Sequence, residues 1–362
     1  MPSIYGGNTL AEVLRRQGFY TIGIHSNPWL SSYYNYNRGF DKFIELLNPS
    51  PTSFKRCFEI LCGKKSKYHN ADEITKTAIN CIEKNAKRRF FLWLHYMDPH
   101  RPCIAHSFFK NASSYLKMFL DMGDKVKLYE ELQEYEIEYV DRVIGNFLRR
   151  LEQMGIWTDE DFIFLTADHG EEFGEHKGIG HRLKLYDELL HVPLIIDGPE
   201  IEKKQTINYQ VELLDVSPTI CNLIGIKLPE SFQGKSLFAK SHSKRTESVI
   251  SEYKEKNESG FSCRNMKWKF ILTIRKEGIR RELYDLTKDK KETLNVYERN
   301  KDIATVYERY LLKHIEEEDI VREKYCLIKK IEEMKEEEKP EQAYMPEKEE
   351  KIKSHLRSLG YL

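Results

Sequence analysis

Apolar residues recur with a helical period in three long stretches of this 362-residue chain. In residues 8–18 the apolar side chains share one face, Asn8 or Thr9 can cap the start, and Gly18 ends the pattern. Residues 71–85 and 126–154 repeat the period over greater lengths. We expect each stretch to form a helix that packs by its apolar stripe.

Short apolar runs lie between these helices and predict β-strands. They cover residues 19–24, 90–96, 162–165 and 192–196. The run at 90–96 is continuously apolar apart from His95, which is typical of a strand that is covered on both faces. We expect His95 itself to be a hydrogen-bonded core residue. The succession of helices and strands predicts an α/β domain over residues 1–238.

The character of the sequence changes after residues 239–247, which are polar and predict a domain boundary. Runs at 249–252, 266–274 and 282–286 predict short antiparallel strands. Residues 267–270 alternate, so one side of that strand is expected to face water. Helices are predicted from Ile303 onward, and residues 332–351 are rich in Lys and Glu. The second predicted domain is an α+β subdomain over residues 239–362 with a charged helical tail.

Candidate chemistry is concentrated where the strand at 162–165 ends, in the sequence TADHG at residues 166–170. Asp supplies a hard anionic oxygen and His supplies a borderline nitrogen, and ligands of open α/β sheets bind beyond the carboxyl ends of the strands. Asp168 and His169 are therefore candidate metal ligands, with a purely structural Asp–His pair as the alternative. Gly170 is expected to let the backbone turn sharply away. The basic, glycine-containing loop that follows contains His176, Lys177 and His181.

A second polar segment follows the predicted strand at 90–96. Here His100 and Arg101 lie between Pro99 and Pro102, which stiffen the loop. Arg offers a planar fork of donors and His a switchable charge, and both suit an oxyanion. We therefore expect His100 and Arg101 to face an anionic substrate.

Charge and cysteine content narrow the class of protein. The chain has 58 basic and 58 acidic residues, which gives no argument for nucleic-acid or membrane binding. Seven cysteines are scattered without a CxxC pair, as expected for free thiols in a reducing compartment. Since no signal peptide or run of 18 apolar residues is present, we expect a cytoplasmic protein without membrane or nucleic-acid partners. Its oligomeric state is left open.

Several of these segments together resemble the sulfatase family of the alkaline phosphatase superfamily. The match is dense around the TADHG strand end and the loop after it. It extends to other segments: TLAEVLRRQGF at 9–19, GFD at 39–41, DPHRP at 98–102, VELLDVSPTI at 211–220, GKSL at 234–237, ELYDL at 282–286 and the tail LRSLGYL at 356–362.

The resemblance implies a fold and a set of roles. The fold would be an alkaline-phosphatase-like three-layer sandwich, with a mostly parallel central sheet, helices on both faces, and a small carboxyl-terminal antiparallel sheet with helices. Asp168 and His169 would hold a divalent cation, Ca or Mg first and Mn or Zn as alternatives. His100 and His181 would be catalytic residues at the sulfate of an anionic ester, either a small molecule or a saccharide.

The resemblance also implies three substrate-binding residues, namely Arg101, Lys177 and His25. In many relatives a Lys and a His that follow the strand corresponding to residues 19–24 reach the sulfate, whereas this chain has His25 and Asn27 there. A surface position for His25 is the alternative.

One part of the family pattern is missing. Sulfatases need a first strand with acidic metal ligands and then a nucleophile, a Cys or Ser converted to formylglycine, in a pattern like C/S-x-P-S-R-x-S-x-x-x-G. When the sequence is laid on that pattern, Ser3 falls on the second Ser and Gly7 on the last Gly, and the nucleophile would precede Met1. The sequence thus predicts an N-terminally truncated chain, and Ser3 is a weaker substitute nucleophile.

Three functions remain open at this point. The first is a metal-dependent hydrolase of sulfuric esters, impaired or inactive as written if the nucleophile segment is absent. The second is a phosphomonoester or phosphonate hydrolase, or a phosphoglycerol transferase, of the same superfamily. The third is an inactive fragment or a binding protein. Reactions at sulfur and at phosphorus are both displacements at a tetrahedral anion, so the residues above barely separate them.

Overall fold

The computed structural model describes residues 7–47, 70–85, 88–100, 125–238 and 248–317. These residues form two compact units, one ending at Thr158 and the other beginning at Asp159. Across the described residues, no helix has both the length and the apolar character that crossing a lipid bilayer requires.

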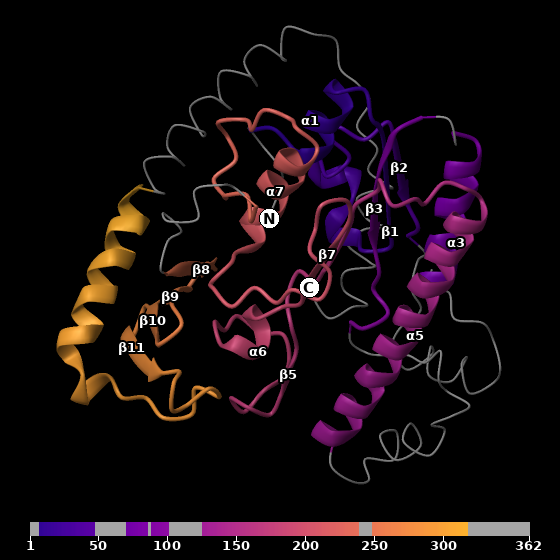
Figure 1. The fold of residues 1–362 in the computed structure, drawn as a ribbon. Helices are drawn as coiled ribbons and strands as arrows, with labels where there is room; N and C mark the ends of the chain where they lie inside the picture. Colours follow the sequence, from indigo (N-terminus) through magenta and orange to yellow (C-terminus); the bar gives the residue numbers. More distant parts are fainter. Residues whose placement is uncertain (1–6, 48–69, 86–87, 101–124, 239–247, 318–362) are drawn as a thin grey trace, which may run out of the picture. The chain divides into compact units, whose positions relative to one another are not determined.

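Among its described residues, the first unit contains a three-stranded parallel sheet and three α-helices, whose arrangement can be followed in Figure 1. Its helices are α1 (Leu10–Arg16), α3 (Ala71–Glu83) and α5 (Lys125–Gln153). Its strands are β1 (Tyr20–His25), β2 (Lys42–Glu45) and β3 (Phe90–His95), in the order β2-β1-β3. The strands are in register such that His25, at the end of β1, lies between Glu45 and His95.

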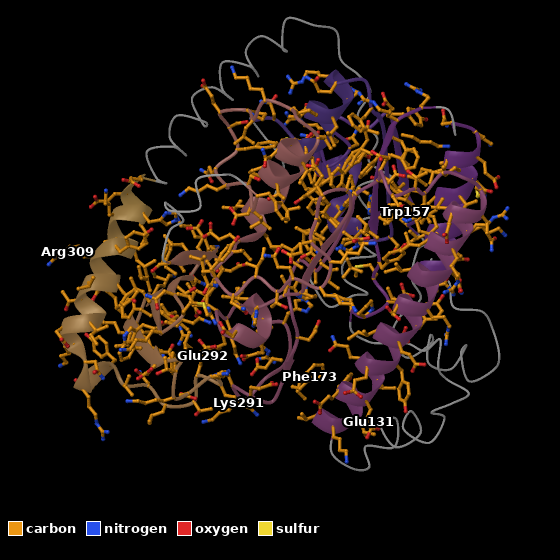
Figure 2. The ribbon with its side chains drawn as sticks, viewed as in Figure 1. Glu131, Trp157, Phe173, Lys291, Glu292 and Arg309 are labelled. Atoms are coloured by element: carbon orange, nitrogen blue, oxygen red, sulfur yellow. The ribbon has the colours of Figure 1, made fainter. Side chains whose placement is uncertain are left out.

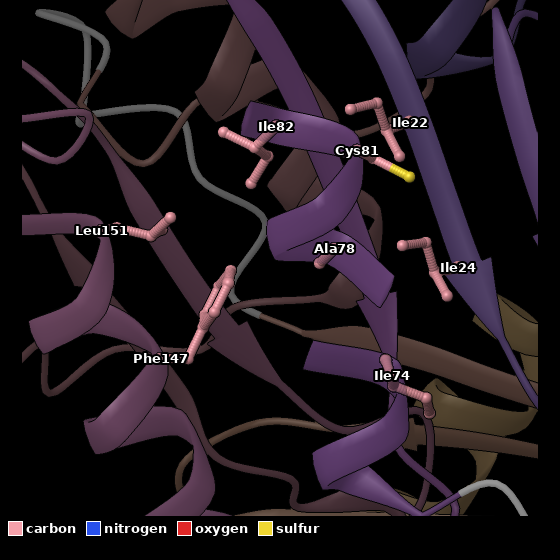
Figure 3. Close-up of a cluster of buried hydrophobic side chains, with 8 residues drawn as sticks. All are labelled: Ile22, Ile24, Ile74, Ala78, Cys81, Ile82, Phe147 and Leu151. Carbon is pink, nitrogen blue, oxygen red and sulfur yellow. The ribbon is translucent and has the colours of Figure 1, made fainter. Parts of the chain in front are cut away.

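One face of β1 is apolar and packs against α3 and α5. The side chains of Ile22 and Ile24 point to this face because alternate residues of a strand share a side. Each fully buried aliphatic side chain stabilises the fold by about 1.5–3 kcal/mol. The cluster therefore holds the sheet to its two helices. Its members are Ile22, Ile24, Ile74, Ala78, Cys81, Ile82, Phe147 and Leu151 (Figure 3).

The opposite face of this sheet is aromatic. Rings from the loop before β2, from β2 and from β3 lie against one another at Phe40, Phe43, Phe91 and Trp93. Gly23 leaves room for them, since a Cβ at this position would come within 2.8 Å of the Phe43 ring. The ring of His25 lies on this side too, with its centroid 4.9 Å from that of Phe43.

The GFD segment at residues 39–41 fastens a loop to β1 and α1. Asp41 accepts a hydrogen bond from the main-chain N–H of Thr21 at 2.9 Å, and the Thr21 hydroxyl donates to the Gly39 carbonyl at 2.7 Å. Gly39 has a φ of 84°, and a Cβ there would lie 2.2 Å from the main-chain nitrogen of Glu12. Only glycine meets both demands. The segment is therefore structural.

The second unit begins with the strand that leads to the TADHG sequence. Strand β4 (Ile163–Thr166) pairs antiparallel with β7 (Leu194–Asp197), and they form a sheet of their own among the described strands. Between them lie the short hairpin strands β5 (Glu172–Phe173) and β6 (Ile179–Gly180) and the helix α6 (Asp187–Leu190). The helix α7 (Val216–Leu223) follows.

The second unit ends in a four-stranded antiparallel sheet that is covered on both faces. Its strands are β8 (Val249–Lys254), β9 (Glu258–Arg264), β10 (Trp268–Arg275) and β11 (Gly278–Asp285), in the order β11-β10-β9-β8. A helix over residues 301–317 packs on one face, through Ala304 and Leu311 against Phe270 and Leu283. On the other face, Ile271 packs with the segment that leads into α6, at Leu185 and Tyr186.

Most of the predicted helices and strands are confirmed within a few residues, and Thr9 caps α1. Strands β2, β5, β6 and β9 were not predicted. The expectation of a solvent-facing side on β10 was wrong at Lys269, which is fully buried because it faces α6. The predicted boundary at residues 238 and 239 stays a prediction. Residues 239–247 and 332–351 lie outside the described residues.

Candidate metal and substrate site

Asp168 and His169 lie in the turn that follows β4. The Thr166 hydroxyl donates to the Pro193 carbonyl at 2.8 Å, which fixes the end of β4 to the segment before β7. The main-chain N–H of His169 donates to Asp168 Oδ1 at 3.0 Å, so the carboxylate is held beside the ring. The Asp168 side chain is 65% exposed and is open to a ligand.

The His169 ring has the orientation expected of a metal ligand. Its Nδ1 lies 2.9 Å from the Gly170 carbonyl oxygen, and because a carbonyl only accepts, Nδ1 carries the hydrogen. Nε2 then carries the lone pair, 3.8 Å from Asp168 Oδ2. Histidines that bind metals usually donate their other N–H in this way. The two donor atoms are thus close enough to share one cation.

Gly170 is required by a close approach and not by a special backbone angle. Its main-chain N–H donates to the Leu189 carbonyl at 2.8 Å, and a Cβ at this position would lie 2.0 Å from the Glu188 carbonyl oxygen. Its φ is not in the left-handed region. The predicted turn at Gly170 therefore does not depend on a left-handed backbone angle. The glycine allows the strand end to lie directly against α6.

His181 lies beside His169, with 4.4 Å between the ring centroids. Its Nδ1 is 2.9 Å from Glu171 Oε1, and the Glu171 side chain is only 5% exposed. The sequence prediction that His181 works near the Asp168–His169 pair is consistent with this geometry. Sequence reasoning missed Glu171, whose position directly after the DHG triplet is the one local signal for it.

The loop that carries His181 is anchored by a second glutamate. Glu172 is fully buried and accepts hydrogen bonds from the Lys184 ammonium and from the main-chain N–H groups of His176 and Gly178. Burial raises the pKa of Glu172, but these partners outweigh it and lower the pKa overall. Lys177 is exposed on the β5–β6 turn with a φ of 67°.

His176 connects this loop to two other segments of the second unit. Its Nδ1 lies 2.6 Å from Glu188 Oε1 in α6, and its Nε2 lies 3.0 Å from the Glu292 carbonyl oxygen. The ring stacks on Tyr186 at 3.6 Å between centroids. Both ring nitrogens are thus engaged within the fold. His176 is a structural residue of the loop.

A buried group of charges fixes α6 to the carboxyl-terminal sheet. The Lys269 ammonium is fully buried and lies 2.8 Å from both Asp187 Oδ1 and Glu292 Oε1. Arg264 adds a further ion pair to Asp187 at 2.9 Å. Figure 2 labels Glu292, which belongs to the loop that follows β11 in the sequence and precedes the helix over residues 301–317. Burial raises the pKa of Asp187, and Lys269 and Arg264 more than reverse that shift.

His100 lies in the first unit, in the turn after β3. Its main-chain N–H donates to the Met97 carbonyl at 3.1 Å. Gln133 of α5 donates to the Pro99 carbonyl at 3.3 Å, and Asp98 accepts from the main-chain N–H of Ala71 at the start of α3. Two helices therefore hold the turn that presents His100. Arg101 and Ser3 lie outside the described residues.

His25 is buried, so the alternative of a surface histidine was wrong. Its side chain is 0% exposed at the carboxyl end of β1, and burial lowers its pKa to about 4. The ring is therefore neutral at pH 7 and brings no positive charge. A contact with an anionic substrate at this residue would be a hydrogen bond rather than a charge–charge contact.

The fold defines the class of protein. An α/β architecture with a small antiparallel sheet is the alkaline-phosphatase-like fold, and solved structures share it. Phosphonate monoester hydrolase from Silicibacter pomeroyi matches with a TM-score of 0.66 at 17% identity over 86% of this chain and 80% of that chain. A protein solved with its substrate D-glucosamine-2-N,6-O-disulfate matches with a TM-score of 0.61 at 18% identity, over 90% and 84%.

The chain belongs to the sulfatase family, whose model matches residues 3–226. A second model, the carboxyl-terminal domain of N-sulphoglucosamine sulphohydrolase, matches residues 174–320. Arylsulfatase K from Bos taurus is 29% identical over 168 residues, covering 43% of this chain and 31% of that protein. Delta 4,5-hexuronate-2-O-sulfatase from Bacteroides thetaiotaomicron is 32% identical over 145 residues, covering 37% and 30%. The matches thus span under a third of these relatives' length.

Proposed function

We propose that this protein is a metal-dependent hydrolase of sulfuric esters. The observation that carries the proposal is the grouping of Asp168, His169 and His181 at the end of β4, within the part of the chain that matches the sulfatase family. Two imidazoles and a carboxylate at one strand end suit an anionic ester that is held against a cation.

Asp168 and His169 are the residues that would hold the cation. The orientation of the His169 ring and the exposure of Asp168 fit a divalent metal ion, and the family is metal dependent. A carboxylate oxygen with an imidazole nitrogen suits several ions, so we propose Ca or Mg first, with Mn or Zn as alternatives. A bound divalent cation would draw negative charge from the ester oxygens.

The chain's own side chains would do the remaining work. His181 and His100 are the proposed catalytic residues at the sulfate, and Arg101 and Lys177 are proposed to bind its charge. His25 is neutral, so its proposed contact with substrate is a hydrogen bond.

The proposed substrate is a small or saccharide sulfate ester. Relatives and structural neighbours named for hexuronate and glucosamine sulfates support this class. We propose no nucleic-acid or membrane partner, in line with the balanced charge of the chain. The described cysteines Cys81, Cys221 and Cys263 are buried and unbridged, which supports a cytoplasmic location.

The test compares the hydrolysis of a sulfate ester and a phosphate ester that share the same leaving group. Purified protein is incubated with 4-nitrophenyl sulfate and with 4-nitrophenyl phosphate, with each candidate cation in turn and with chelator. We expect that 4-nitrophenol is released from the sulfate ester in a cation-dependent way, and faster than from the phosphate ester. His181→Ala should remove it, since the variant lacks the imidazole beside His169. His191→Ala is the matched control, because His191 is exposed at the end of α6.

The other outcomes decide against the proposal. Faster turnover of the phosphate would favour a phosphoryl hydrolase. No turnover with any of the cations would favour the third function left open by the sequence, an inactive or binding protein. Turnover that persists in His181→Ala would place the reaction at another site.

A further inference from the structure

We propose that Glu171 is a positioning residue that holds His181 in one tautomer, with the hydrogen on Nδ1 and the lone pair on Nε2. The observation is the 2.9 Å contact between His181 Nδ1 and Glu171 Oε1. A carboxylate only accepts, so the ring nitrogen donates. The proposal rests on the proposed function for its purpose but not for its test.

A comparison with the neighbouring Glu172 shows that stabilising the fold does not account for a buried glutamate at position 171. Glu172 is buried and its carboxylate is saturated by an ammonium and two main-chain N–H groups. Glu171 is almost as buried, yet its bond to His181 is its only hydrogen bond among the described residues, and its Oε2 has none. A buried carboxylate oxygen without a partner costs free energy. Glu171 thus contributes less to the fold than to the orientation of one site histidine.

The consequence for the site is chemical. A neutral imidazole in water favours neither nitrogen strongly, whereas one that donates from Nδ1 to a fixed acceptor offers its lone pair at Nε2. His169 is held in the same tautomer by the Gly170 carbonyl. Two adjacent rings, with centroids 4.4 Å apart, would therefore both present Nε2 lone pairs. His181 can then accept a proton or a hydrogen bond at Nε2 without first rotating or changing tautomer.

The test reads the tautomer directly and needs no turnover. Long-range ¹⁵N–¹H correlation spectra of the ¹⁵N-histidine-labelled full chain, recorded at pH 8 where an ordinary imidazole is neutral, distinguish the two nitrogens. Loss of the His181 signals in His181→Ala assigns them. We expect Nδ1–H at His181 in the wild type, loss of that preference in Glu171→Ala, and its retention in Glu171→Gln, whose amide oxygen still accepts.

Two controls separate positioning from general disruption. His169 should keep Nδ1–H in every Glu171 variant, because its acceptor is a main-chain carbonyl. Glu188→Ala should alter His176 and leave His181 unchanged, because Glu188 bonds only the former. If Glu171→Ala alters both His169 and His181, Glu171→Gln decides: retained Nδ1–H at His181 supports the proposal, and its loss overturns it. Unchanged His181 signals in Glu171→Ala also overturn it.

Failure here and failure of the proposed function are distinguishable. The tautomer is measured without metal or ester, so it can hold in a protein that turns nothing over. In a protein that hydrolyses 4-nitrophenyl sulfate, Glu171→Ala should lower kcat by about tenfold or more and leave KM nearly unchanged. Glu171→Gln should restore most of that loss.

Discussion

In each unit, a different kind of interaction stabilises the segment that carries the candidate site residues. In the first unit, β1 ends at His25, and its Ile22 and Ile24 pack against aliphatic and aromatic side chains from α3 and α5. In the second unit, the loop with His169 and His181 is held by buried glutamates, a buried lysine and α6. The apolar cluster tolerates some change of shape, but buried charges depend on every partner. The loop in the second unit is thus the more easily disrupted of the two.

The largest effect should follow from removing the buried cation of the second unit. Lys269→Met leaves Asp187 and Glu292 buried without their shared partner, and we expect a loss of about 4 kcal/mol in the free energy of unfolding. Urea unfolding at pH 7 measures it. Lys276→Met, at an exposed position beyond β10, is the control and should change little.

The same variant has a pH signature. The pKa of Asp187 is lowered in the folded protein, so its contribution is present above the ordinary carboxyl pKa and is lost as the pH falls through the folded value. Without Lys269 the carboxylates protonate more readily. The difference between wild type and Lys269→Met should therefore shrink as the pH is lowered toward 4. A difference that stays constant with pH would show that the loss is one of packing and not of charge.

A slightly smaller effect is expected in the apolar cluster of the first unit. Ile24→Ala removes a fully buried side chain that packs with α3 and α5, which should cost about 3.5 kcal/mol. Urea unfolding should show this loss, and it should be independent of pH between 7 and 4. A loss below about 1 kcal/mol would mean that the site collapses freely and that the cluster is looser than described.

Burial of His25 predicts a pH dependence in the first unit. Its folded pKa of about 4 lies below its ordinary value of 6.5, so the unfolded chain binds a proton first as the pH falls. Folding stability should therefore drop by about 3 kcal/mol between pH 6.5 and pH 4 from this residue alone. His25→Gln should remove that component. Identical pH profiles for the two proteins would contradict the burial of the ring.

The smallest effect is expected at an exposed ion pair. Arg150 of α5 and Glu83 of α3 lie 3.8 Å apart, and each side chain is about half exposed. Arg150→Ala should change the free energy of unfolding by no more than about 0.5 kcal/mol. A loss comparable to that in Lys269→Met would remove the distinction between buried and exposed charges on which the comparison rests.

The features that could be read from the sequence are those with a local pattern. The capped helix α1, the long helix α5 and the runs that form β1, β3 and β4 follow from periodic apolar residues and from their stop signals. Strand β9 was missed because its residues ESGFSCR are mostly small or polar. Its Gly260 lies under the Tyr253 ring, where a Cβ would come within 2.2 Å of a ring carbon. The need for glycine at this position therefore comes from Tyr253 of β8, a neighbouring strand, and cannot be read from the β9 sequence itself.

The site divides in the same way. Asp168, His169 and His181 could be named because they stand at a strand end and in the loop after it, and the structure brings the two histidines together. Glu188, Glu292 and Lys269 could not be named, since their partners lie up to 116 residues away in the chain. The sequence therefore points to the candidate site residues more readily than to the groups that hold them in place.

The most direct test of the central claim is cation binding by isothermal titration calorimetry. Wild-type protein should bind one Ca²⁺ or Mg²⁺ with a Kd on the order of 10⁻⁴–10⁻³ M. Asp168→Asn and His169→Gln should each weaken binding by at least about tenfold. Asp197→Asn, at an exposed carboxylate on the end of β7, should bind as the wild type does. Equal affinities in all four proteins would contradict a metal site at the end of β4.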